Sequence, residues 1–155
     1  MLKKKGASIR FFLKYPFHTH GGMGFKRGEM LSKIEFGKLG EELAVAFLKR
    51  EGCRIIEQNY KCLFGEIDII ARFKKTLIFA EVKTRHPSHL GLPQEAVDKR
   101  KQEQIAKTAL HYLATHQLLK KPARFDVLSI LVNPDGSKEV EWLKDAFPLP
   151  ERYSY

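Results

Sequence analysis

Two adjacent apolar stretches carry charged side chains at positions where buried strands usually carry none. The segment 66–85, EIDIIARFKKTLIFAEVKTR, places Asp68 in the first stretch and Glu81 and Lys83 in the second. Two carboxylates at short range are half of an oxygen-ligand site for a hard divalent cation, of which Mg²⁺ is the natural example. Metal-assisted chemistry is therefore the first function to consider for this segment.

The turn between the two stretches determines which of their residues lie opposite each other. A turn of two or four residues centred on 74–75 pairs residues whose numbers sum to 149, so that Asp68 faces Glu81 and Glu66 faces Lys83. All four side chains then lie on one face of the sheet. Directly opposed like charges destabilise a strand pair. A shared proton, the ammonium group of Lys83 or a bound cation would each offset this repulsion.

A helix before these strands can supply a third carboxylate. Apolar residues recur at steps of three and four from Ser32 until Gly52 ends the pattern, which predicts one amphipathic helix. Glu41 lies at the edge of its apolar stripe, whereas Glu42 lies on the solvent side. A carboxylate at the edge of a core is costly unless it is paired or bound to metal, so Glu41 is the candidate. Lys101 flanks the stripe of a second helix and can face the same site.

The elements that would position these residues follow from periodicity and turn signals. Apolar runs predict strands, the last of them at the edge of the sheet, and Pro93 is a suitable first residue for the second helix. A strand, a long helix and another strand form a crossover, so 123–133 should run parallel to 77–85 in one mixed sheet. The predicted order is αβββαββ, with a helix from 32, strands at 54–61, 66–72 and 76–85, a helix from about 93, and strands at 123–132 and 138–147.

Length and charge indicate one domain with a basic tail. The chain of 155 residues is long enough for one core. Residues 1–31 lack periodicity and are expected to be a flexible tail, while 32–150 form the domain. Of the net charge of +10, residues 1–30 carry +6 and the remaining 125 residues carry +4. Basicity is therefore weak support for nucleic-acid binding by the domain itself.

The sequence also carries signals about location. The basic start has no signal-peptide pattern, and no stretch approaches the ~20 apolar residues of a membrane span. Cys53 and Cys62 fit neither a metal motif nor a disulfide framework, and buried reduced thiols are expected. We expect a soluble, cytoplasmic protein with no membrane partner.

Five motifs in order resemble a known family. They are GKLGEELAVAFLKREG, GEIDIIAR, IFAEVKTR, GLPQEAVDKRKQ and RFDVLSI, within residues 35–133. Together they resemble the YraN-like proteins, a bacterial family considered similar to archaeal Holliday junction resolvases. More broadly, Asp68 and Glu81-x-Lys83 resemble the PD-(D/E)xK nuclease core. The resemblance implies an α/β, restriction-endonuclease-like αβββαβ core with a mixed central sheet, to which this chain adds a C-terminal strand.

What the resemblance implies about chemistry is metal-dependent phosphodiester cleavage. Asp68 and Glu81 would bind Mg²⁺, or Mn²⁺, alongside the backbone carbonyl of Val82. Lys83 would orient and activate the attacking water. Glu41 matches a helix glutamate that binds metal directly or through water. Such a cation would neutralise the scissile phosphate and stabilise the charge that develops on it.

Two further basic residues are candidates for nucleic-acid contact. Lys101 matches a family lysine that would contact phosphate, although a lysine on a helix flank is also ordinary. Arg85 points to the same face as Lys83 and has a planar fork suited to phosphate, although surface arginines are common at strand ends. For the charged strand residues themselves, the alternative is an exposed cross-strand ion cluster.

These observations lead to an expected function with two rivals. We expect a metal-dependent endonuclease that hydrolyses DNA, with branched DNA and a homodimer suggested by the resolvase resemblance alone. The first alternative is a nucleic-acid binding module that keeps the nuclease fold without cleavage. The second is a scaffold in which the acidic face is incidental.

Overall fold

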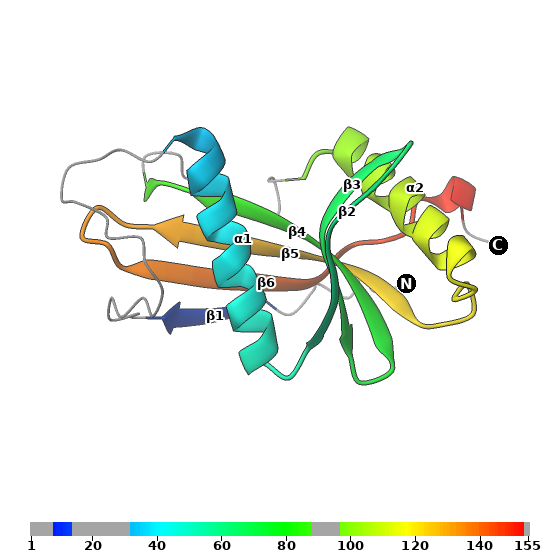
Figure 1. The fold of residues 1–155 in the computed structure, drawn as a ribbon, viewed down its shortest axis with the longest axis horizontal. Helices are drawn as coiled ribbons and strands as arrows, with labels where there is room; N and C mark the ends of the chain where they lie inside the picture. Colours follow the sequence, from blue (N-terminus) through cyan, green and yellow to red (C-terminus); the bar gives the residue numbers. More distant parts are fainter. Residues whose placement is uncertain (1–7, 14–31, 88–96, 154–155) are drawn as a thin grey trace.

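The computed structural model describes residues 8–13, 32–87 and 97–153 (Figure 1). Six strands and two helices make up this part of the chain, followed by a short 3₁₀ helix. In chain order they are β1 (Ser8–Leu13), α1 (Lys33–Arg50), β2 (Arg54–Cys62), β3 (Gly65–Phe73), β4 (Thr76–Arg85), α2 (Lys99–Thr115), β5 (Ala123–Val132), β6 (Lys138–Phe147) and η3 (Glu151–Tyr153).

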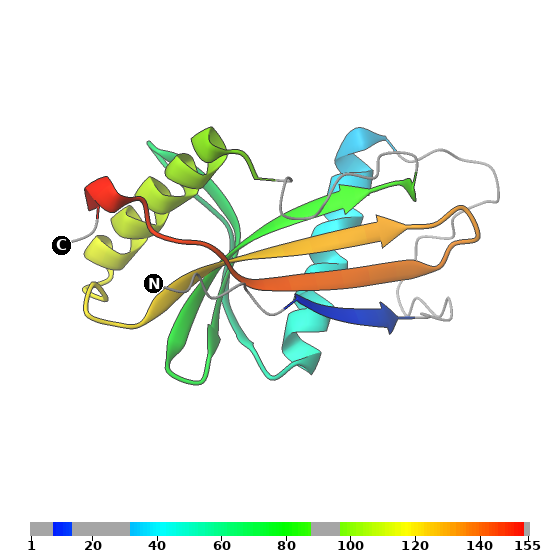
Figure 2. The same ribbon diagram turned by 180° about the vertical axis from the view of Figure 1, so that it is seen from behind.

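The strands form one mixed sheet in the order β1-β6-β5-β4-β3-β2. β4 and β5 pair in parallel across the connection that contains α2, and the other neighbouring pairs are antiparallel. Figures 1 and 2 show the strong twist of this sheet, with the β2–β3 hairpin curling towards α2. The predicted α/β class, the αβββαβ order, the mixed sheet and the extra C-terminal strand are confirmed.

Helix α1 packs on one face of the sheet. Ser32 caps its first turn through a reciprocal capping box with Glu35, which satisfies backbone N–H groups that the helix leaves free. Its buried side chains Ala44, Phe47 and Leu48 form one cluster with Cys53 and with residues of β3 to β6. The strand residues of this cluster are Ile69, Ala71, Ile78, Ala80, Leu128, Ile130, Val140 and Trp142. Gly40 allows α1 to approach β4, because a Cβ there would collide with the side chain of Thr84.

Helix α2 packs on the opposite face. The described helix begins at Lys99 with Asp98 as its N-cap, later than the predicted start near Pro93, which lies outside the described residues. The cluster that it helps to form contains Ile67, Ile70, Leu77, Phe79, Val97, Ile105, Ala106, Ala109, Tyr112, Leu113, Phe125, Val127, Leu143 and Phe147. Ile67 and Ile70 both belong to this cluster although they are three apart. Strand β3 therefore departs from strict alternation around Asp68.

The structure differs from the sequence prediction at one edge of the sheet. Residues 8–13 form β1, although the first 31 residues were expected to be a tail without strands. β1 pairs with β6 from Ser8↔Leu143 to Leu13↔Lys138. β6 consequently lies between β1 and β5 and is not the edge strand that the sequence suggested.

The β3–β4 hairpin has the predicted register. Its pairs run from Phe73↔Thr76 to Ile69↔Ala80, so paired numbers sum to 149, and the turn is Lys74-Lys75. The described pairing stops one pair before Asp68 would face Glu81. Glu66 does not meet Lys83 as expected: its carboxylate pairs with Lys61 at 3.2 Å. The two strands separate here because β3 follows β2 towards α2.

Neither described helix is both long enough and apolar enough to cross a membrane.

Candidate active site

Asp68 and Glu81 meet at the point where strands β3 and β4 part. The backbone N–H of Val82 donates a hydrogen bond to Oδ2 of Asp68 at 2.7 Å. This hydrogen bond between the side chain of Asp68 and the backbone of β4 lies just beyond the last backbone pair of the two strands. The carboxylate of Asp68 is consequently held beside Glu81, and both residues are anchored by strands whose central residues are buried in the core.

Glu81 is an acidic side chain in the interior. Only 3% of its surface is exposed. Its Oε1 lies 2.8 Å from Nζ of Lys83 on the same strand and 3.3 Å from Nζ of Lys101 on α2. Its Oε2 is buried and has no hydrogen-bond partner. A buried oxygen of this kind is costly unless something binds it, so Glu81 has one satisfied oxygen and one that is available.

The environment of Asp68 opposes its ionisation. Burial, the charge of Glu81 and the charge of Glu41 raise the pKa of Asp68 from its ordinary value of 3.8 to about 7, with burial the largest cause. The hydrogen bond from Val82 and the charge of Lys101 act in the opposite direction. Without a bound cation, the negative charge of these three carboxylates is greater than the positive charge of the nearby Lys83 and Lys101.

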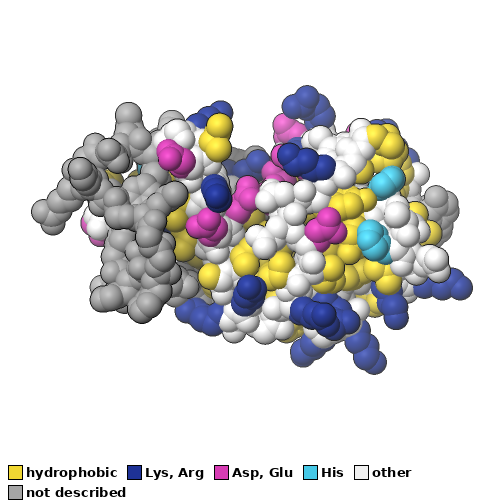
Figure 3. Space-filling model, in the orientation of Figure 1, with side chains coloured by type: hydrophobic (Ala, Val, Ile, Leu, Met, Phe, Trp, Pro, Cys, Tyr) yellow, Lys and Arg dark blue, Asp and Glu magenta, His cyan; other side chains and the backbone are white. Residues whose placement is uncertain are grey.

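The two neighbouring glutamates of α1 differ as the helical periodicity predicted. Glu41 is half-buried and its charge acts on Asp68, whereas Glu42 is exposed. In the space-filling view, acidic side chains gather over α1 and between it and the β2–β3 hairpin, with basic side chains among them (Figure 3). Glu41 therefore lies on the side of α1 that faces the candidate site.

The donor set at this place fits a hard divalent cation. Asp68 and the free Oε2 of Glu81 are oxygen donors, and the backbone of Val82 adjoins them through its hydrogen bond to Asp68. Within the described ranges, no three His, Cys, Asp or Glu side chains are grouped closely enough to hold a metal ion. The ligands that this site can offer a cation are thus two carboxylates and a main-chain oxygen. Glu41 is not one of these direct ligands.

The two basic residues predicted to contact nucleic acid lie at different places. Lys101 faces the site through its contact with Glu81, and 25% of its side chain is exposed. Arg85 is the last residue of β4, where it pairs with Leu131 of β5, two residues beyond Lys83. Their contact with nucleic acid remains a prediction.

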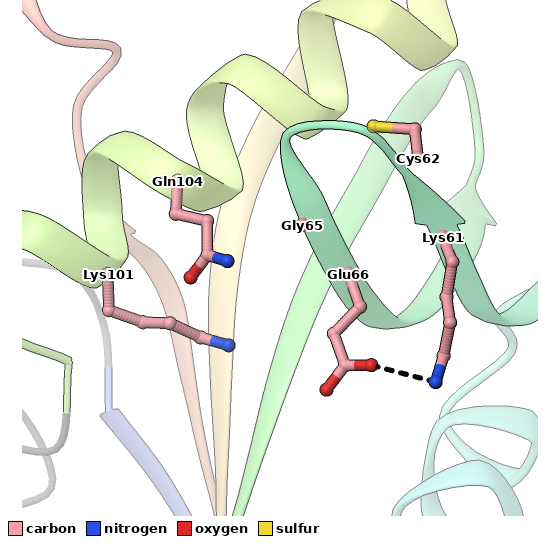
Figure 4. A pocket seen from close by; sticks show the side chains of 6 residues that line it. All are labelled: Lys61, Cys62, Gly65, Glu66, Lys101 and Gln104. Carbon is pink, nitrogen blue, oxygen red and sulfur yellow. Dashed lines mark ion pairs between the residues drawn. The ribbon is translucent and has the colours of Figure 1, made fainter.

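A cleft that the sequence did not predict opens beside the site. It has a volume of about 350 Å³ and lies between the β2–β3 hairpin and α2 (Figure 4). Lys101 lines this cleft and also contacts Glu81, so the cleft adjoins the acidic site. Lys61, Gly65 and Glu66 are close together in the sequence. The position of this hairpin against α2, however, depends on how β3 bends.

A second buried acid belongs to the core. Asp126 is fully buried and accepts hydrogen bonds from Arg124, from the indole of Trp142 at 2.8 Å and from the backbone N–H of Asp145. Arg124 and Asp126 therefore form an ion pair on β5, and Trp142, which donates to the same carboxylate, is buried. Its hydrogen bonds satisfy both oxygens of Asp126, in contrast to Glu81.

Both cysteines are free thiols. Cys53 is buried, as expected, while Cys62 is half-buried at the rim of the cleft.

Comparison with solved structures finds a distant likeness. The structure of Pyrococcus furiosus SfsA in complex with Ca²⁺ aligns with 17% sequence identity and a TM-score of 0.32. The alignment covers 68% of this chain and 59% of that one.

Comparison with known sequences is much closer. A UPF0102 protein of Syntrophus aciditrophicus is 50% identical over 120 residues, which cover 77% of this chain and 94% of that protein. A UPF0102 protein of Geotalea uraniireducens is 50% identical over 73% of this chain and 89% of its own length. A third, of Dictyoglomus turgidum, is 48% identical over 76% of this chain and its full length. The sequence profile described as "Uncharacterised protein family UPF0102" matches residues 40–130. The chain therefore belongs to the UPF0102 family, the YraN-like proteins that its motifs resemble.

Proposed function

We propose that this protein is a divalent-metal-dependent endonuclease that hydrolyses phosphodiester bonds of DNA. The observation that carries the proposal is the state of Glu81, whose buried carboxylate has two lysines on one oxygen and no partner on the other. An unpaired buried carboxylate oxygen beside a second carboxylate is the arrangement that a bound cation relieves.

Asp68 and Glu81 would hold the cation, Mg²⁺ or Mn²⁺, together with the main-chain carbonyl of Val82. Oxygen donors suit both ions. When bound, the cation neutralises charge on the phosphate and makes a bound water more acidic. Glu41 acts from outside this group, where its charge adds to the negative potential that attracts the cation.

The lysines supply the remaining groups of the reaction. Lys83 is held by Glu81 with 35% of its side chain exposed, so its ammonium group can hydrogen-bond and orient a water molecule that enters from solvent. Lys101 contacts the same oxygen of Glu81 from α2 and can bind a non-bridging phosphate oxygen. Arg85 at the end of β4 is a second candidate for phosphate binding.

The substrate assignment rests on the family resemblance. DNA as substrate, branched DNA in particular, and a homodimer all follow from the likeness to resolvases, and the charge of the domain adds little because residues 1–30 carry +6 of the net +10. A homodimer would allow paired cuts on the two strands of a junction.

A cleavage assay tests the proposal. Labelled duplex, flap and junction DNA are incubated with the protein and Mg²⁺ or with EDTA, and the products are separated on a denaturing gel. We expect cutting with Mg²⁺ that disappears in Glu81→Gln and Lys83→Ala, while Glu42→Gln, a change to the exposed neighbour of Glu41, keeps full activity. Cutting that survives in both site variants would show that a contaminant causes it and would contradict the proposal.

A nucleic-acid binding module without cleavage is the second candidate. Among the described residues no three acidic side chains are close enough to hold a metal ion together, and a site with two carboxylates favours binding without cleavage. This alternative predicts that the protein binds DNA and that the DNA stays intact in both EDTA and Mg²⁺. Lys83→Ala should then weaken DNA binding only by the loss of one positive charge.

A further inference from the structure

The cleft beside the candidate site is a built feature of the fold. The hairpin residues Lys61, Cys62, Gly65 and Glu66 form one wall, and Lys101 and Gln104 of α2 form the other. Figure 4 shows the side chains of Lys101 and Gln104 pointing from the helix towards the hairpin. One wall is a strand pair and the other is a helix, so both walls are regular elements of the fold.

Gly65 sets the width of the cleft at its upper end. It has a φ of +141°, a conformation that residues with a side chain rarely adopt. A Cβ at this position would collide with the side chain of Gln104. With any other residue at position 65, either the side chain of Gln104 or the hairpin itself would have to shift.

Lys61 is the lysine of the cleft that can take up an anionic group. Lys61 and Lys101 are positive and Glu66 is negative, but Lys101 is already paired with the buried Glu81 at 3.3 Å. The ion pair between Lys61 and Glu66 has 70% and 48% of its side chains exposed. Such exposed pairs are weak, typically below about 1 kcal/mol, so Lys61 can exchange this partner for an incoming phosphate.

Gln104 adds a group that can read a base. Its amide carries two donors and one acceptor, the residue is exposed, and among the described residues its side chain makes no hydrogen bond. An amide at the wall of a cleft can bond to the edge of an unstacked base.

We propose that this cleft binds one unpaired nucleotide of the substrate strand, next to the phosphodiester that is cut. The inference rests on the proposed function and specifies its substrate class, namely DNA with an unpaired nucleotide at the site. Lys101 joins the two places, because it lines the cleft and contacts Glu81 at 3.3 Å. A volume of about 350 Å³ is near the lower end of small-molecule sites, about 300–1,000 Å³.

Size explains why the nucleotide must be unpaired. A base inside a duplex is stacked and paired, and it reaches a pocket of this kind only when it leaves the stack. Flaps, gaps and branch points provide such bases without the cost of unpairing. The cleft therefore discriminates between these substrates and a continuous duplex.

A binding measurement tests the inference independently of cleavage. Fluorescein-labelled duplex with a short single-stranded tail is compared with the same duplex fully paired, by fluorescence anisotropy in Ca²⁺, and the DNA is checked afterwards to be intact. The proteins are the unaltered chain, Lys61→Ala, Glu66→Gln and Gln104→Ala. Lys107→Ala is the matched control, because Lys107 is an exposed lysine of α2 that does not line the cleft.

We expect the unaltered protein to bind the tailed DNA several-fold more tightly than the duplex. Lys61→Ala should reduce this preference and lower the slope of log Kd against log salt by about 0.7, the value for one lost contact to single-stranded phosphate. Glu66→Gln should strengthen binding of the tailed DNA, because it removes the negative charge and releases Lys61. Gln104→Ala should weaken binding without changing the salt slope, and Lys107→Ala should leave the preference intact.

Equal affinity for the two DNAs, no binding of either, or a preference that Lys61→Ala and Lys107→Ala change alike would overturn the inference. These results are separable from a failure of the proposed function. A protein that shows the predicted preference and never cuts DNA in Mg²⁺ keeps the nucleotide site and loses the nuclease assignment. A protein that cuts with Glu81 dependence but binds both DNAs equally keeps the nuclease and loses the nucleotide site.

Discussion

The backbone N–H of Val82 donates a hydrogen bond to Oδ2 of Asp68, with 2.7 Å between nitrogen and oxygen. This contact joins β3 and β4 beyond their last described backbone pair, Ile69↔Ala80. Strand β3 turns with β2 towards α2, so its backbone no longer pairs with β4 at this point. The side chain of Asp68 accepts the hydrogen bond from β4 instead. The same separation opens room between the strands at the buried carboxylate of Glu81.

Stability without metal should fall as the pH rises, because of Asp68. The pKa of Asp68 is raised to about 7 in the folded protein, above its ordinary value of 3.8. Its contribution to stability is therefore complete below about pH 4 and is lost as the pH rises through about 7. Asn cannot ionise, so in EDTA Asp68→Asn should unfold at higher urea than the unaltered protein at about pH 8 and at a similar concentration at about pH 4. A difference that is independent of pH would contradict this account.

Removal of Lys83 should separate catalysis from metal binding. Lys83 contacts Oε1 of Glu81, whereas the oxygen available for a cation is Oε2. We expect Lys83→Ala to lower the cleavage rate by about 10²–10³-fold, the usual effect of removing one hydrogen-bond donor that is positioned at the reacting groups. Mn²⁺ affinity, measured by calorimetry, should change little. Lys101→Ala serves as the comparison, and it should raise KM more than it lowers kcat because it affects phosphate binding.

Two glycines of α1 should respond in opposite directions to the same substitution. A Cβ on Gly40 would collide with Thr84, whereas one on Gly37 has no neighbour within 4 Å. Gly37→Ala should stabilise the protein by up to about 1 kcal/mol through helix propensity. Gly40→Ala should destabilise it by about 1–3 kcal/mol, since overpacking outweighs that gain. Thermal unfolding of both variants measures this, and equal shifts in Tm would refute the close approach of α1 to β4.

The buried Asp126 should matter for stability rather than for chemistry. Its oxygens accept from Arg124, Trp142 and the backbone of Asp145. Asp126→Ala leaves these donors unpaired, and we expect a loss of about 3–5 kcal/mol in the free energy of unfolding, as for other broken buried pairs. Lys121→Ala, at an exposed position, should change it by less than about 0.5 kcal/mol. A loss under about 1 kcal/mol in urea titrations of Asp126→Ala would argue against the network.

Local signals in the sequence predicted most of the site. Alternating apolar residues and a two-residue turn determined the register of β3 and β4, which placed Asp68 beside Glu81 before any coordinates. Helical periodicity distinguished Glu41 from Glu42 in the same way. These properties depend on neighbouring residues in the chain, so a single sequence contains them.

The parallel pairing of β4 with β5 followed from the helical crossover, but the pairing of β1 had no such signal and was not predicted. β1 pairs with β6 from the other end of the chain, and the Lys-rich surroundings of SIRFFL hid the alternation of Ile9, Phe11 and Leu13. The prediction that Glu66 faces Lys83 was wrong for a related reason. Strict alternation assumes a regular strand, and β3 bends next to Asp68, which turns Glu66 towards Lys61 and opens the cleft against α2.

Calorimetric titration of Mn²⁺ shows most directly whether Asp68 and Glu81 bind a cation. The titration is made on the unaltered protein, Asp68→Asn, Glu81→Gln and Glu42→Gln at about pH 8, where Asp68 is ionised. We expect a saturable site in the unaltered protein and in Glu42→Gln that is lost in both Asp68→Asn and Glu81→Gln. A binding heat that persists unchanged in those two variants, or that is absent from the unaltered protein, would contradict it.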